Sequence, residues 1–167
     1  INGQGNRMGN ELSRAAAKVE RLLADAGMAN RVRELDDSTR TAADAAAAIG
    51  CEQAQIAKSL IFRAKESDCA VLVVTCGANR VDLNKVATLI GEGIGKADAD
   101  FVRARTGYAI GGVAPIGHTE PVKIVLDRDL LTFSEIWAAA GTPRAVFGLT
   151  PDELVSLTGG TVGDIAE

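Results

Sequence analysis

Two short stretches of the sequence hold residue types that could serve chemistry. In TGYAIGGVAPIGH, Thr106 to His118, four glycines and a proline accompany the chain's only tyrosine and only histidine. In QIAKSLIF, Gln55 to Phe62, Lys58 interrupts an apolar run. Both stretches lie in segments that carry basic residues and no acid, 56–65 and 101–119. They are therefore the places where an anionic ligand would be sought first.

Lys58 belongs to a predicted strand over residues 56–63. Side chains alternate between the faces of a strand, so Lys58 shares an apolar face with Ile56, Leu60 and Phe62. An ammonium there either extends to water at the strand's end or occupies a pocket in which an anion offsets its desolvation. A ligand phosphate would suit the second arrangement. Ser59, on the opposite face, is a weaker candidate for ligand contact.

The glycine-rich stretch is open to two interpretations. Gly107 is placed to end a helix, which leaves Gly111, Gly112 and Gly117 to be explained. They either form a tight turn or let the backbone approach a ligand closely, while Pro115 stiffens the exit. The Walker lysine and the dinucleotide-binding spacing are both absent from the sequence.

His118 and the three cysteines give weaker signals. A lone histidine beside a loop serves either as an ordinary hydrogen-bonding residue or as a participant in a site. Cys51, Cys69 and Cys76 show no CxxC spacing and are expected to be core thiols. Because no serine or cysteine has an identifiable base beside it, a nucleophilic triad is not indicated. We expect no metal and no cofactor.

Helical and strand patterns alternate irregularly along the chain. Expected helices begin at residues 11, 41, 82, 98 and 150, with glycine stops at 27, 50, 91 and 107 and a TPDEL capping box at 150–154. Expected strands cover 31–37, 56–63, 70–75 and 122–126, followed by a hairpin of 135–141 with 145–149. The order lacks regular βαβ alternation, so the prediction is an α/β or α+β fold with a mixed sheet.

Composition places the chain among ordinary globular proteins. Its 167 residues fit a single domain, predicted over 11–167, with 1–10 as a flexible tail or an expression remnant. A net charge of −4 argues against indiscriminate nucleic-acid binding, and DNA is not expected as a partner. No apolar run reaches the roughly 20 residues of a membrane span. The expected compartment is the cytoplasm, with no membrane partner.

Taken together, these stretches resemble the YbaK/prolyl-tRNA-synthetase-associated domain family of aminoacyl-tRNA editing deacylases. The resemblance runs from Thr39 to Glu167 and rests on the order of four segments: TRTAADAAAAIGCEQAQIAKSLIF, VLVVTCGANRVDLNKVA, TGYAIGGVAPIGH and IWAAAGTPRAVFGLTPDELVSLTGGTVGDIAE. It implies one domain around a mixed, curved, barrel-like sheet flanked by helices. It also implies hydrolysis of the ester that joins a wrong amino acid to the tRNA 3′ end.

The same resemblance assigns roles to particular residues. Lys58 corresponds to the family's lysine at the phosphate and ribose of the terminal adenosine, and Gly111 to Pro115 to its GxxxP loop, whose backbone holds the aminoacyl group. Lys58, Gly111 and Gly112 are thus the expected catalytic residues. The expected substrate-binding residues are Ser59, Val113, Pro115, Gly117, His118 and Gly141. In the family-like DL.K stretch, Asp82 and Lys85 are expected to be structural.

One departure leaves the substrate open. The branch of the family that clears cysteine from prolyl-tRNA has an acidic residue near the position of Val146, after Gly141, and AGTPRAVFGL supplies none. Alanine, cysteine, serine and threonine are all candidate amino acids, on tRNA(Pro) or a related tRNA. A synthetase or an elongation factor is a candidate partner. The alternatives are a non-catalytic aminoacyl- or nucleotide-binding module and an esterase acting on small molecules.

Overall fold

The computed structural model of the chain describes residues 12–36, 39 and 41–167. The tail predicted at 1–10 and the last residue of the predicted strand 31–37 lie outside the described residues. None of the described helices is long and apolar enough to cross a membrane.

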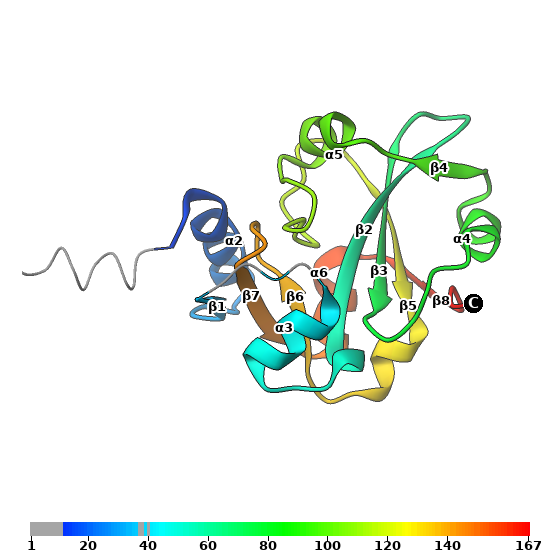
Figure 1. Ribbon diagram of the computed structural model, residues 1–167. Helices are drawn as coiled ribbons and strands as arrows, with labels where there is room; N and C mark the ends of the chain where they lie inside the picture. Colours follow the sequence, from blue (N-terminus) through cyan, green and yellow to red (C-terminus); the bar gives the residue numbers. More distant parts are fainter. Residues whose placement is uncertain (1–11, 37–38, 40) are drawn as a thin grey trace, which may run out of the picture.

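The described residues form one domain with five α-helices and eight strands (Figure 1). The helices are α2 (Arg14–Asp25), α3 (Ala42–Ile49), α4 (Leu83–Ile90), α5 (Ala99–Thr106) and α6 (Pro151–Thr158). The strands are β1 (Val32–Glu34), β2 (Ile56–Ala64), β3 (Ala70–Cys76), β4 (Ile94–Lys96), β5 (Lys123–Asp127), β6 (Ile136–Ala139), β7 (Ala145–Leu149) and β8 (Thr161–Gly163). Two 3₁₀ turns, Gln53–Gln55 and Arg128–Thr132, precede β2 and follow β5.

The strands form one mixed, curved sheet, as the sequence predicts. Their order is β1-β7-β6-β2-β3-β5-β8, and β4 pairs with β2 beside this path. The pairs β2·β6, β3·β5 and β5·β8 are parallel, whereas β6 and β7 form the predicted antiparallel hairpin. In Figure 1 the strand direction turns strongly along this order. The centre of the sheet is β2 and β3.

Both faces of the central strands are covered. Every residue of β3 is buried, in agreement with its continuous β-branched run. Alternate residues of the two strands enter different clusters. Ala57, Leu72 and Val74 pack with α2, α5, α6 and the glycine-rich loop, and Ala64, Val71 and Val73 pack with α4 and β4. Helix α3 packs on Ile56 and Trp137.

The predicted ends of α3, α4, α5 and α6 are confirmed. Helix α2 begins at Arg14 with Ser13 as its N-cap, and the predicted start at residue 11 lies outside the described residues. Thr41, Asp82, Asp98 and Thr150 each cap a helix by accepting a backbone N–H, and Thr150 with Glu153 forms the capping box. The stops Gly50, Gly91 and Gly107 are left-handed, as a C-terminal glycine should be. Lys85 donates to Asp164 and to the Ala166 carbonyl, so the DL.K stretch is structural, as expected.

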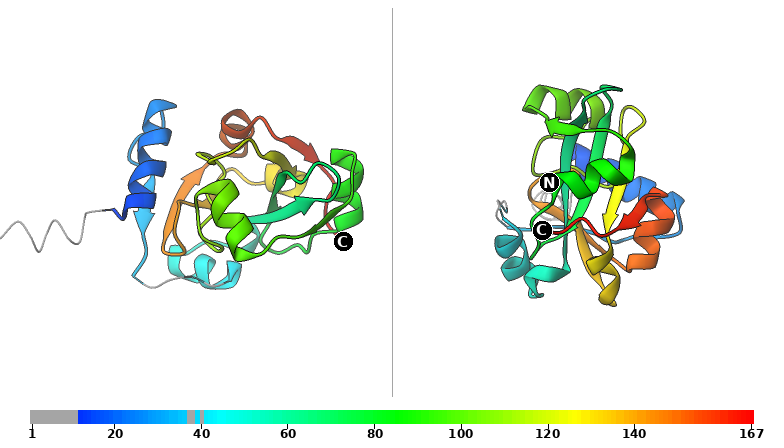
Figure 2. Two further views of the ribbon diagram at one scale, coloured as in Figure 1. Left: turned by 90° about the horizontal axis from the view of Figure 1, so that it is seen from above. Right: turned by 90° about the vertical axis from the view of Figure 1, so that its right-hand side faces the viewer.

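Helix α2 packs against the core of the domain. Ala16, Val19 and Leu23 on its apolar stripe are fully buried. Figure 2 shows α2 standing beside the β6–β7 hairpin. The backbone of Gly141, after β6, approaches so closely that an added Cβ would lie 2.9 Å from the Ala15 carbonyl group. The helix therefore supports the turn between β6 and β7.

Candidate active site

A cleft of about 440 Å³ opens where the sheet is incompletely paired. On one edge of β2, pairing with β6 involves only Ile56 and Ala57, and pairing with β4 begins at Phe62. Residues 58–61 thus have no partner strand on that edge among the described residues. The cleft lies along this gap, walled by β6, the turn after it, α3 and the glycine-rich loop.

Lys58 and Ser59 both line the cleft, from opposite faces of β2. The register with β3 sets Lys58 opposite Thr75 and Ser59 opposite Val74. Lys58 shares its face with Ile56 and is half-buried, which agrees with the predicted alternation. Within the described residues no hydrogen bond or ion pair engages its ammonium. An anion in the cleft would find this charge uncompensated.

The charged side chains that line the cleft are all positive. Lys58 and Lys96 are its two charged residues, and the described lining contains no carboxylate, histidine or cysteine. The rest is mostly apolar, with Trp137, Ile110 and Val146 among the larger side chains. A positive, otherwise apolar cleft favours a ligand with a phosphate and a compact uncharged portion.

The glycine-rich loop supplies one wall through Gly111 and Val113. Gly111 has a φ of +91°, which favours glycine, and an added Cβ would lie 3.6 Å from Pro143. Gly112 is buried against the turn, because its added Cβ would lie 2.6 Å from Thr142 Cα. The loop and the turn after β6 are therefore packed together as two adjacent walls.

Five other predicted residues do not line the cleft. Gly112 packs against the turn behind it, and Gly117 and Gly141 pack against α2. Pro115 is buried. His118 donates from Nε2 to the Ala114 carbonyl at 2.8 Å, and its ring lies edge-on to Tyr108. Burial lowers the pKa of His118 and so favours the neutral form of its ring. These residues therefore support the glycine-rich loop and the turn after β6 without lining the cleft.

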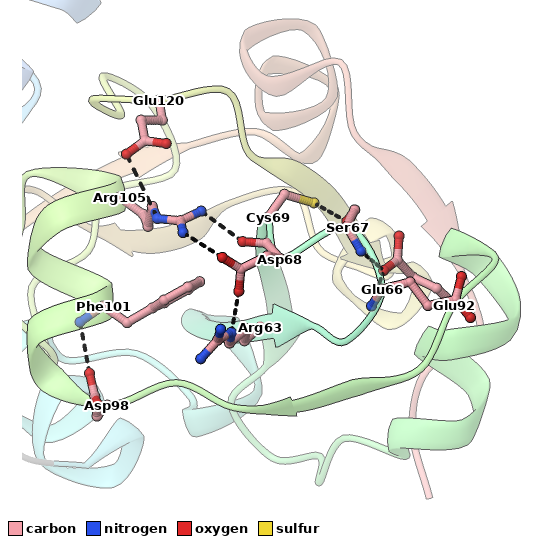
Figure 3. A network of polar contacts seen from close by, with 10 residues as sticks. All are labelled: Arg63, Glu66, Ser67, Asp68, Cys69, Glu92, Asp98, Phe101, Arg105 and Glu120. Carbon is pink, nitrogen blue, oxygen red and sulfur yellow. Dashed lines mark hydrogen bonds and ion pairs between the residues drawn. The ribbon is translucent and has the colours of Figure 1, made fainter.

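A polar network fixes the helix from which the loop starts (Figure 3). Arg105 of α5 donates to the Asp68 carbonyl at 2.7 Å and to its carboxylate at 3.1 Å, and Arg63 pairs with the same carboxylate. The Arg105 guanidinium also lies 4.6 Å from the Phe101 ring centre. The two arginines hold the pKa of Asp68 below 3.8. Helix α5, and with it the start of the loop at Gly107, is thereby tied to the β2–β3 hairpin.

Sequence reasoning missed several walls of the cleft. Trp137, Thr142 and Pro143 come from β6 and its turn, and Lys96 from β4. Ile110, with 58% of its surface exposed, is the most exposed of the large apolar side chains at the described positions. The Thr142-Pro143 pair between two strands was the available signal, because it marks a fixed turn.

Comparison with known proteins identifies the family. Residues 36–157 match the aminoacyl-tRNA editing domain. This chain belongs to the aminoacyl-tRNA editing domain family. The match covers β2, the glycine-rich loop and the β6–β7 hairpin, and it begins after α2 and β1. The expected membership in the YbaK-type family is thus confirmed.

Three relatives give the range of similarity. The uncharacterised Bacillus subtilis protein YwhH is 35% identical over 125 residues, 75% of this chain and 79% of that protein. A candidate Cys-tRNA(Pro)/Cys-tRNA(Cys) deacylase, EbsC of Enterococcus faecalis, is 29% identical over 126 residues, 75% of this chain and 76% of its own length. A crystal structure of a candidate trans-editing enzyme for prolyl-tRNA synthetase is 47% identical, covers 94% of this chain and 99% of its own, and has a TM-score of 0.88. The editing-domain fold is therefore shared over nearly the whole chain.

Proposed function

We propose that this editing domain is a trans-acting deacylase that hydrolyses the ester of a small, wrongly attached amino acid on tRNA. The observation that carries the proposal is that Lys58 and the glycine-rich loop line one cleft. The relatives described as acting on Cys-tRNA or with prolyl-tRNA synthetase support tRNA(Pro) or a related tRNA as the carrier. Alanine, cysteine, serine and threonine are the candidate amino acids.

The cleft suits the 3′ end of an aminoacyl-tRNA. Lys58 would bind the phosphate and ribose of the terminal adenosine, since it is the charge on β2 that the cleft exposes. Gly111 and Val113 would bring the loop's main chain to the aminoacyl group. Gly112, Pro115, Gly117, His118 and Gly141 would hold the two walls in place from behind. The small lining residues Ala57, Ala138 and Ala145 leave room for a short side chain.

Hydrolysis requires no protein nucleophile here. The ester is already activated, so a positioned water can attack the carbonyl; the ester C–O bond then breaks, which releases the amino acid with a free carboxyl group and leaves the hydroxyl on the tRNA 3′ end. Orientation of the reactants contributes up to about 7–11 kcal/mol of barrier lowering in favourable cases. A main-chain N–H aimed at the developing oxyanion contributes about 3 kcal/mol more. Both contributions depend on how rigidly the cleft holds the ester.

The test is deacylation of Ala-, Cys-, Ser- and Thr-tRNA(Pro) by the wild type, Lys58→Ala and Lys65→Ala. Lys65 is an exposed lysine just beyond β2 and does not line the cleft, so it is the matched control. We expect selective hydrolysis by the wild type and by Lys65→Ala, and loss of hydrolysis in a folded Lys58→Ala. Full activity of Lys58→Ala would remove this residue from the mechanism.

A second candidate is a binding module that recognises an aminoacyl-nucleotide without turnover. It is favoured by the described lining, which holds no acid and base pair. Saturable binding of a nonhydrolysable aminoacyl-adenosine, with no hydrolysis of any charged tRNA, would establish it. Equal turnover of free aminoacyl esters and aminoacyl-tRNA would instead indicate a small-molecule esterase.

A further inference from the structure

The open edge of β2 presents main-chain groups to the cleft at Ser59. The N–H of Ala64 donates to Cys69 and the N–H of Gly77 donates to Ile56, so even-numbered residues of β2 direct their main chain toward β3. The N–H of Lys65 donates to Gly93 in the segment before β4, so odd-numbered residues face the other edge. Ser59 lies on this edge within the gap between β6 and β4. Its N–H and C=O therefore point outward from the strand edge that borders the cleft.

The side chain of Ser59 is also without a partner. Its hydroxyl oxygen is buried and makes no hydrogen bond among the described residues, and it is the one described buried side-chain oxygen or nitrogen of which this is true. Ser59 lines the same cleft as Lys58 and Gly111. Buried hydroxyls nearly always have partners, because leaving one unpaired opposes folding. Ser59 thus brings two main-chain groups at the open strand edge and one unpaired hydroxyl to the cleft that it lines.

We propose that the aminoacyl group of the substrate docks on Ser59 as one residue of a partner strand would. Its α-ammonium donates to the Ser59 carbonyl and hydroxyl, and its ester carbonyl accepts the Ser59 N–H. An aminoacyl ester carries the donor and acceptor of a strand residue, and peptides commonly bind to free sheet edges in this way. Lys58, the preceding residue, holds the terminal nucleotide from the opposite face of β2. This docking rests on the proposed deacylase function.

The Ser59 hydroxyl then has opposite effects on stability and on activity. In the free protein it is buried without a partner, so Ser59→Ala should raise the melting temperature. In the complex it accepts a hydrogen bond from a charged donor, and such bonds change binding by about 10- to 100-fold. A serine retained only for packing would affect stability without affecting recognition of the ammonium.

The experiment is a cycle of two enzymes and two substrates. Wild type and Ser59→Ala are compared on alanyl-tRNA(Pro) and on lactyl-tRNA(Pro), in which a hydroxyl replaces the ammonium. We expect Ser59→Ala to lower kcat/KM for alanyl-tRNA by about 10-fold or more, and to leave the lactyl ester nearly unaffected. The ratio between the two esters cancels their different intrinsic reactivity. Ser156→Ala, at an exposed position on α6, should change neither rate.

Equal losses on the two esters, or no loss on either, would overturn the docking while leaving the deacylase proposal intact. A lower melting temperature for Ser59→Ala would contradict the unpaired hydroxyl on which the inference depends. If the wild type hydrolyses no charged tRNA, the same cycle is run as binding of 3′-alanylamino-3′-deoxyadenosine and its lactyl counterpart. Weaker binding of the alanyl compound alone to Ser59→Ala would then support the docking although the proposed function had failed, and unchanged binding of both compounds would overturn the docking as well.

Discussion

The contact between Gly112 and the turn after β6 gives a quantitative test of how the cleft is held. A Cβ added at Gly112 would lie 2.6 Å from Thr142 Cα. Carbon atoms in contact rest about 3.5 Å apart, so Gly112→Ala must separate the loop from the turn by about 1 Å. Overpacking of this kind costs about 1–3 kcal/mol, or about 2–12 °C in melting temperature for a chain of this size. A 1 Å misplacement of reacting groups lowers rates by about 100-fold.

Deacylation by Gly112→Ala should therefore show a kcat/KM about 100-fold below that of the wild type, measured at a temperature where both are folded. Gly91→Ala is the control: Gly91 has a φ of +84°, ends α4, and has no atom within 4 Å of an added Cβ. It should lose about 1–2 kcal/mol of stability through backbone strain and keep its activity. An unchanged kcat/KM in a destabilised Gly112→Ala would refute the idea that packing of the two walls sets the rate.

Three further predictions concern the support of the site. Asp127, which is 1% exposed, accepts hydrogen bonds from Thr75, Cys76 and Asn79, so Asp127→Ala should cost at least about 3 kcal/mol, measured by denaturant unfolding. Lys18 of α2 donates to the Gly117 carbonyl at 2.7 Å, and Lys18→Met should lower both stability and kcat/KM, whereas an unchanged kcat/KM would separate α2 from the site. Hydrogen bonds lower the pKa of Glu92 and of Glu153 from 4.5 to about 2, so their stabilisation is complete above pH 4.5 and is lost as pH falls toward 2. The melting temperature should fall over that range, and less steeply in Glu153→Gln.

Local sequence signals predicted most of the fold. Helix ends were readable because capping is a short-range interaction: Thr41, Asp82 and Thr150 each bond a backbone N–H only two or three residues away. The strand at 70–75 was readable from its unbroken apolar run. The short strands β4 and β8 were missed because three residues carry no usable period, and their partners lie far away along the chain.

The site was predicted less completely. Lys58 stood out because it breaks an apolar pattern, and the structure places it in the cleft with Ser59, Gly111 and Val113. The glycines suggested close approach to a ligand, yet Gly112 approaches the turn at Thr142. The sequence indicates that a glycine is needed where another group comes close, but it does not show whether that group is a ligand or another part of the chain. Trp137 could not be assigned, since its place in the wall depends on the parallel pairing of β6 with β2.

The position of the cleft follows from where sheet pairing stops. An unpaired strand edge normally invites association with another strand, and proteins usually cover or shorten such edges. Here β6 and β4 cover the two ends of the β2 edge and leave 58–61 uncovered, with Lys58 at the start of that gap. The opening spans about four residues, or roughly 13 Å, so a longer partner strand would meet β6 or β4 at its ends. The opening is long enough for one aminoacyl group beside the nucleotide to which that group is attached. The interruption in pairing therefore both exposes the edge of β2 and limits the size of the ligand that can bind there.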